Sequence, residues 1–206
     1  MKRYTLAIIL LLVTLTASAQ KLGVTGGLTL SQLENIKESR NAGYNAGVSL
    51  NIPLVLGLSL QPELIYNVKG ATLPDVPDTK YTAGYCELGL QAQWGLDLIV
   101  AKPFVLLEPY VGGSTRKTLL VQDQSFKADL GGLADRLECG LAVGGGIEIL
   151  SRLQLAVKYF RTLGTLLGSD GNLNPSLGSS ASGQVSDILN GVGYFTGTTV
   201  SLTYFF

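Results

Sequence analysis

The sequence contains no histidine, which removes the side chain most often used as a general base and as a transition-metal ligand. Hydrolases and acyltransferases that rely on a serine–histidine pair are therefore excluded. The sequence offers no other set of nucleophile and base, so we expect a protein that is not an enzyme and binds no cofactor.

Segments that could suggest a phosphate site or a calcium site also lack the features that this binding needs. The glycine-rich segment GGGIEI lies inside a predicted strand and opens no helix, unlike a loop that cradles phosphate. The segments LPDVPDTK and GSDGNLN have acidic turn residues but neither the full ligand set nor the closing glutamate of a calcium loop. We interpret both as solvated turns and expect no metal site.

Charge is also scarce, because Asp, Glu, Lys and Arg make up only 15% of the residues and balance to a formal net charge of zero. A soluble surface usually carries roughly a quarter or more charged residues. The charge balance gives no electrostatic argument for nucleic acid as a partner. The length suits one domain of ordinary size, and the composition suggests that water is not its main solvent.

No apolar run reaches the roughly 20 residues that a membrane-spanning helix needs. The apolar run at residues 6–15 follows Lys2 and Arg3 and precedes the small residues at 17–19, which is the pattern of a cleaved secretory signal peptide. We therefore expect residues 1–19 to be a signal peptide and residues 20–206 to be the mature domain. No cysteine follows the cleavage site, which argues against a lipoprotein.

Apolar and polar residues alternate with a period of two in eight runs, each of which predicts a strand with two unlike faces. The run YNAGVSLNI is typical, because Tyr44, Val48 and Ile52 oppose smaller polar residues. Two residues break the alternation, Ile65 and Leu106. The eight predicted strands lie at residues 21–30, 44–52, 58–67, 85–94, 104–113, 137–149, 153–160 and 198–206.

Connections between these runs alternate between short and long. Short turns on one side and long polar loops on the other are typical of an outer-membrane barrel. A soluble lipocalin-like barrel also closes eight antiparallel strands, but it would turn long charged side chains outward. Here the polar face consists mostly of small residues, which suit a narrow interior. The sequence therefore predicts an all-β fold: an eight-stranded antiparallel up-and-down transmembrane β-barrel with short periplasmic turns and long extracellular loops.

Aromatic residues collect near the predicted strand ends, as they do in the interfacial girdles of membrane barrels. This placement predicts outer-membrane lipid as the partner of the apolar face. Ordinary cross-strand packing of aromatic rings is the alternative. The residues concerned are Tyr44, Tyr66 and Tyr159 at the long-loop side and Trp94, Tyr204 and Phe206 at the short-turn side.

Four carboxylates and one lysine take the inward parity and are the candidate functional residues. Buried ionised groups must be paired or hydrated. We expect Glu63, Glu87 and Glu108 to form an acidic cluster that Lys158 partly neutralises, with Glu148 also facing inward. The cluster favours a structural plug, and a proton-sensitive or gated passage is the alternative.

The two cysteines, Cys86 and Cys139, take the outward parity on two predicted strands that are separated by a third. Two strand spacings are roughly 9 to 10 Å, which is too far for a disulfide without backbone movement. We therefore predict two free thiols.

The chain resembles the PorT-like family of outer-membrane β-barrels. The resemblance rests on the segment SLQPELIYNVKGA with Glu63, Tyr66 and Lys69, on the segment YCELGLQ, and on the aromatic C-terminal run. The fourth strand departs from the family pattern, since Leu88 follows the acidic residue where a proline is usual. The resemblance implies an outer-membrane location and a role beside a secretion complex. In such barrels the aromatic terminal strand resembles the signal for the barrel-assembly machinery, which implicates Tyr204 and Phe206.

Three functions remain open at this point, in order of preference. The first is a structural or interaction barrel whose loops engage an envelope or secretion-complex protein. The second is a narrow channel or small-ligand receptor, and the third is an enzyme, for which the sequence supplies no catalytic set. Fold alone does not choose among them, because barrels of one kind host unrelated functions.

Overall fold

A computed structural model describes residues 20–33, 40–73, 79–121, 124–127, 137–165 and 195–206. The expected signal peptide, residues 1–19, lies outside the described residues. In the part of the chain that the structure describes, no helix has the length and apolar character needed to cross a membrane.

The described residues form nine strands, and all paired neighbours run antiparallel. Their bounds are β1 (Lys21–Leu33), β2 (Asn41–Pro53), β3 (Leu58–Leu73), β4 (Thr79–Gly95), β5 (Ala101–Val121), β6 (Gln124–Lys127), β7 (Leu137–Ile149), β8 (Leu153–Thr165) and β9 (Phe195–Phe205).

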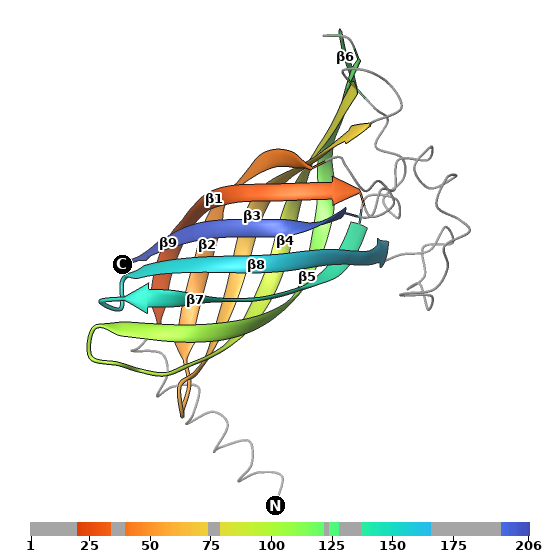
Figure 1. The fold of residues 1–206 in the computed structure, drawn as a ribbon. Helices are drawn as coiled ribbons and strands as arrows, with labels where there is room; N and C mark the ends of the chain where they lie inside the picture. The colour runs from red at the N-terminus through yellow and green to blue at the C-terminus, as the bar shows by residue number, and fades with distance from the viewer. Residues whose placement is uncertain (1–19, 34–39, 74–78, 122–123, 128–136, 166–194) are drawn as a thin grey trace, which may run out of the picture.

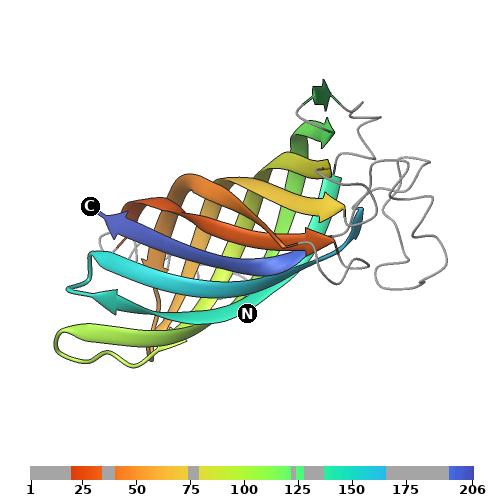
Figure 2. The ribbon, with the colours of Figure 1, turned by 45° about the horizontal axis from the view of Figure 1, so that its top comes forward.

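Eight of these strands close into one barrel, in the ring order β1-β2-β3-β4-β5-β7-β8-β9 (Figures 1 and 2). The pairing of β1 with β9 joins the first strand to the last, so that no strand of the ring has a free edge. The short β6 pairs only with the far end of β5 and lies outside the ring. The predicted eight-stranded antiparallel up-and-down barrel is confirmed.

Alternation along the strands separates a lumen face from an outer face. On β8, for example, the exposed outward residues are Leu153, Leu155, Val157 and Tyr159, and the buried inward ones are Gln154, Ala156, Lys158 and Phe160. Because successive side chains of a strand point to opposite faces, one register places an apolar band outside and polar groups inside. The two residues that break the alternation, Ile65 and Leu106, are buried on the lumen side.

Apolar side chains fill part of the lumen at two levels. Phe104, Leu106 and Ala156 form one cluster. A larger cluster lies toward the other end of the barrel and contains Ala71, Ala83, Tyr85, Tyr110, Ala142, Phe160 and Phe195. The inward face is therefore not uniformly polar, and its polar residues are enclosed among apolar ones.

The strands are longer than the sequence pattern predicts, because they continue beyond the residues that alternate. β5 has 21 residues, and the pairings of β3, β4 and β5 extend well above the rest of the ring (Figure 1). A hydrogen-bond ladder persists in water, where neither face needs to be apolar, so the alternation fades before the strand ends. Lys69, which follows the predicted strand at residues 58–67, therefore lies within β3.

The predicted free thiols are confirmed, since both cysteines are unpaired in the structure. Cys86 lies on β4 opposite Gly113, and Cys139 lies on β7 opposite Val111, so β5 separates the two. The cross-strand geometry that forbids the disulfide is the one expected from the parity of the two residues.

Candidate functional site: the charged lumen

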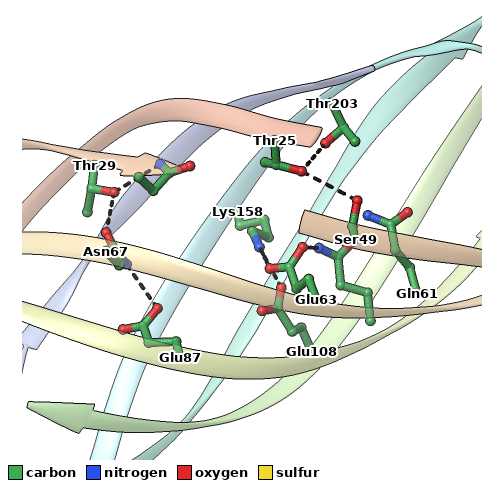
Figure 3. A network of polar contacts seen from close by, with 12 residues as sticks. Thr25, Thr29, Ser49, Gln61, Glu63, Asn67, Glu87, Glu108, Lys158 and Thr203 are labelled. Atoms are coloured by element: carbon green, nitrogen blue, oxygen red, sulfur yellow. Dashed lines mark hydrogen bonds and ion pairs between the residues drawn. The ribbon is translucent and has the colours of Figure 1, made fainter. Parts of the chain in front are cut away.

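The first group of charges in the lumen is one lysine held between two carboxylates, which we call the lower ion layer. Lys158 Nζ lies 2.6 Å from Glu63 Oε1 and 2.7 Å from Glu108 Oε2 (Figure 3). All three residues are buried. Because β3, β5 and β8 supply one residue each, the layer ties together three separate parts of the barrel wall.

Neutral groups complete the surroundings of these carboxylates. The side-chain amide of Gln91 on β4 donates a hydrogen bond to Glu63 Oε2 at 2.5 Å. Gly89 faces the same level, and a Cβ atom at that position would collide with Glu108 Oε1. The absence of a side chain at Gly89 therefore leaves the space that the Glu108 carboxylate occupies.

A second lysine forms the upper ion layer, nearer to the ends of the strands that carry the long loops. Lys69 Nζ lies 2.7 Å from Glu87 Oε1 and 2.5 Å from Glu138 Oε1. Lys69 is fully buried. Its pairing uses β3, β4 and β7, so the two layers together connect five strands of the ring.

Three aromatic rings surround the ammonium group of Lys69. Its Nζ lies 4.7 Å from the ring centroid of Tyr85, 5.1 Å from that of Tyr110 and 5.0 Å from that of Phe160. These distances are within the range of cation–π attraction, which is strongest where water is excluded. The rings and the two carboxylates together compensate for the burial of a full positive charge.

A chain of neutral hydrogen bonds occupies the space between the two layers. Asn45 donates to Thr29, the hydroxyl of Thr29 donates to Asn67 Oδ1, and the amide of Asn67 donates to Glu87 Oε2 (Figure 3). A cavity of about 30 Å³ lies beside this chain and is lined by residues of both layers. Its volume suits about two water molecules, given roughly 10–15 Å³ for each.

Amide side chains fill the lumen below the lower layer. Gln93 donates to Gln61 and Gln91, and Gln154 donates to Gln93. Asn51 and Ser59 join the same network. Each of these groups is buried and satisfied by a neighbour, as buried polar groups must be.

The structure divides the expected charge cluster into two parts. Glu63 and Glu108 share Lys158, as the sequence suggests, whereas Glu87 pairs with Lys69 in the other layer. Sequence reasoning missed Lys69 and Glu138 as members of the lumen set. The available signal was parity, since Lys69 continues the inward series of Glu63 and Asn67, and Glu138 begins the inward series of β7. Glu148 pairs with Lys21 at 3.0 Å, near the short-turn end.

The residues of the expected assembly signal lie on the outer face at the short-turn end. Tyr204 and Phe206 are both exposed, and their rings pack edge to face with centroids 5.4 Å apart. Phe205, between them, is completely buried on the lumen side. The two outward rings therefore form one small aromatic surface beside the apolar band.

The chemistry available to the two ion layers is charge pairing, because Lys69 and Lys158 are each already bound to two carboxylates. In the described residues, no group of three or more Cys, Asp or Glu side chains is placed to hold a metal ion. The arrangement joins the barrel walls across a narrow interior and occupies the path along the barrel axis.

If the lower ion layer excludes water, removing its lysine should leave two buried carboxylates without a cation. We expect Lys158→Ala to lower the free energy of unfolding by about 3–5 kcal/mol. The double variant Lys158→Ala/Glu63→Ala should recover part of this loss, because one stranded charge is removed with its partner. Urea unfolding in detergent, followed by the heat-dependent gel shift of folded barrels, gives the coupling energy.

The pair of Lys102 and Asp97 supplies a matched control, since its atoms are 3.4 Å apart and Asp97 is exposed. The same cycle on this pair should give a coupling below about 1 kcal/mol. A coupling between Lys158 and Glu63 that is no larger than the control value would contradict the dry ion pair.

A search of curated proteins gives no match to this sequence. Solved structures with a similar arrangement include Neisserial surface protein A, at 11% identity and a TM-score of 0.46, covering 90% of this chain and 96% of that one. The attachment invasion locus protein Ail of Yersinia pestis has 11% identity and a TM-score of 0.43, covering 91% and 97%. The N-terminal β-barrel domain of Pseudomonas aeruginosa OprF has 8% identity and a TM-score of 0.40, covering 90% and 97%.

A family model matches most of the sequence directly. The match covers residues 18–168, which include seven of the eight ring strands and every charged residue of both ion layers. The chain belongs to the family described as the outer membrane protein beta-barrel domain.

Proposed function

We propose that this outer-membrane barrel is a non-catalytic structural or interaction protein with a plugged lumen. It acts through its extracellular loops, beside an envelope or secretion-complex protein as the resemblance to PorT-like barrels implies. Residues 1–19 serve as the cleaved signal peptide that directs export. The observation that carries the proposal is the filled lumen, since a barrel that does not conduct must work through its surface.

The two ion layers support the plug. A passing ion or solute would have to separate Lys158 from two carboxylates and then Lys69 from two more, all of them buried except the partly buried Glu87. Breaking a buried pair costs about 3–5 kcal/mol. The cavity between the layers, at about 30 Å³, is far smaller than a typical ligand pocket of about 300 Å³ or more.

The alternative is a narrow channel or a receptor for a small ligand. One observation favours it: a cavity of about 170 Å³ opens at the short-turn end and is lined by charged residues, including Lys21, Asp97, Lys102 and Glu148. This cavity lies below the amide network and the ion layers. It is therefore open at the short-turn end but does not continue through the lumen. A ligand held there would have to be small and polar.

Planar bilayer recordings distinguish the plug from the channel. The unmodified protein, with insertion checked by the gel shift of recovered material, should show no steady single-channel conductance at neutral or acidic pH. The physical reason is that the paired charges fill the lumen at two levels. Steady conductance at neutral pH would contradict the plug, and current that develops only on acidification would favour a gated passage.

Photo-crosslinking in intact cells tests the interaction role. A photoreactive residue in place of Thr115, which is exposed on β5 near the long-loop end, should yield adducts with an envelope protein. The same residue in place of Val143, which is exposed near the middle of β7, should yield lipid adducts only. Recovery of no protein adduct from the Thr115 position would contradict engagement at the loop side.

We also propose that Tyr204 and Phe206 are read by the barrel-assembly machinery, as terminal aromatic residues are in similar barrels. Deletion of Phe206 should lower the yield of folded protein in the outer membrane. Leu202→Ala is the control, because it shortens an exposed apolar side chain on the same face of β9 without touching the aromatic pair. Equal folded yields for both changes would contradict the assembly signal.

A further inference from the structure

The three short turns carry apolar residues at positions that are normally polar. Ile99 is fully exposed, and Leu56, Val55 and Leu150 are exposed by 87%, 71% and 70%. Large exposed apolar patches mark surfaces that bind a partner or a membrane. We call residues 54–56, 96–100 and Leu150 the short-turn rim.

Backbone conformation does not explain these residues. Leu56 has a φ of 58° and Leu150 a φ of 51°, and both lie in tight hairpin turns. Such positions favour glycine, asparagine or aspartate, because a side chain with a large Cβ substituent is strained at positive φ. Leucine at both positions therefore costs conformational energy, and it would also expose apolar surface if the turns lay in water.

Backbone hydrogen bonds hold the rim together, and it projects from the barrel. In the turn between β4 and β5, the amide of Leu96 donates to the carbonyl of Pro103, and that of Leu98 donates to the carbonyl of Ala101, each at 3.0 Å. These bonds extend the hairpin beyond Gly95, and it projects at the end of the barrel opposite β6 (Figures 1 and 2). The amide of Leu150 donates to the carbonyl of Val100, which joins this hairpin to the turn between β7 and β8.

The upper edge of the apolar band, at the long-loop end, is marked by the first polar residues on the outer face. Above Tyr159, the next outward residue of β8 is Arg161, and above Val200 the next outward residue of β9 is Thr198. Thr115 occupies a similar position on β5. The outward tyrosines therefore lie at the upper limit of the hydrocarbon, since aromatic girdles sit at the membrane–water interface.

Measured downward from these tyrosines, the outward series of β3 and β8 are too short to fill the hydrocarbon. A strand that rises 3.3 Å per residue and tilts by about 40° gains roughly 2.5 Å of height per residue. The outward series from Tyr66 to Leu58 then spans about 20 Å, and that from Tyr159 to Leu153 about 15 Å, against an apolar band of about 25 Å. On these two strands the missing height is about 5–10 Å, which places the short-turn rim at the lower limit of the band, just beyond the expected girdle of Trp94, Tyr204 and Phe206.

We propose that the short-turn rim is embedded in the inner leaflet of the outer membrane and that its binding partner is phospholipid. The rim continues the outer apolar face from Trp94 to Leu96, and the charge of the exposed Asp97 within the same hairpin is paired with Lys102 at 3.4 Å. Several charged residues of this end line the mouth cavity, which rim residues also border on their inner side: Leu54, Leu98, Ile99, Val100 and Leu150. Exposed Arg152, beside Leu150, can extend its guanidinium to a lipid phosphate, as long cationic side chains do at interfaces.

Depth-dependent fluorescence quenching tests this placement, because the chain has a single tryptophan, Trp94. The variant Trp94→Phe/Ile99→Trp places the only indole at the tip of the rim. The variant Trp94→Phe/Thr115→Trp places it at the opposite end as the matched control. Each purified barrel is reconstituted into vesicles of phosphatidylethanolamine and phosphatidylglycerol with brominated acyl chains, and acrylamide is the aqueous quencher.

The indole introduced by Ile99→Trp should be quenched strongly by brominated lipid and weakly by acrylamide, and the Thr115→Trp control should show the reverse. Trp94→Phe/Leu56→Trp repeats the test on a second turn, in case one variant fails to fold. Ready quenching by acrylamide at both rim positions would overturn the proposal and leave the rim for a periplasmic protein. Protection of the rim indoles from acrylamide that disappears at a lower protein-to-lipid ratio would also overturn the proposal. The partner would then be a second copy of the chain.

Discussion

A closed ring of eight strands leaves room for about two water molecules beside its buried charges, too few to hydrate them, and this constraint governs the interior of the barrel. A lysine ammonium placed there must find carboxylates or aromatic rings within contact distance. Lys158 meets the requirement with two carboxylates, and Lys69 meets it with two carboxylates and three rings. Because the partners come from separate strands, satisfying the charge also fixes how the walls face one another.

Small residues in the lumen make room for the long charged side chains. Gly89 faces the carboxylate of Glu108, and Gly112 faces the side chains of Glu87 and Glu138. In a narrow barrel, long side chains on one wall require short ones on the opposite or adjacent wall. Gly89 and Gly112 thus leave the space that the carboxylates of the two ion layers occupy. A lumen filled this way leaves the outer and loop surfaces as the places where the protein meets other molecules.

Alternation predicted most of the fold because lipid imposes it: a residue that faces hydrocarbon must be apolar and its neighbour on the lumen side need not be. The same parity placed Glu63, Glu108 and Lys158 in the interior. It could not show that Glu87 pairs with Lys69, because pairing across the lumen depends on the stagger between strands, which a period of two does not contain. Lys69 itself lies two residues beyond the predicted strand at residues 58–67, since the alternation of apolar and polar residues ends before β3 does.

Lipid and lumen also impose different demands on the short-turn end, and the last residues of β9 illustrate how one strand meets both. Phe205 is completely buried and lies across from Gly23, where a Cβ atom would come within 2.7 Å of its ring. Phe206 points the opposite way, beside Tyr204, into the surface that continues toward the apolar turns. Because adjacent residues of a strand must point to opposite faces, two consecutive phenylalanines close the interior and extend the lipid-facing surface at the same height. A shift of one residue in the register of β9 would exchange these two roles and would place Thr203 in lipid. The lipid outside and the packed lumen inside therefore both fix the pairing of β1 with β9.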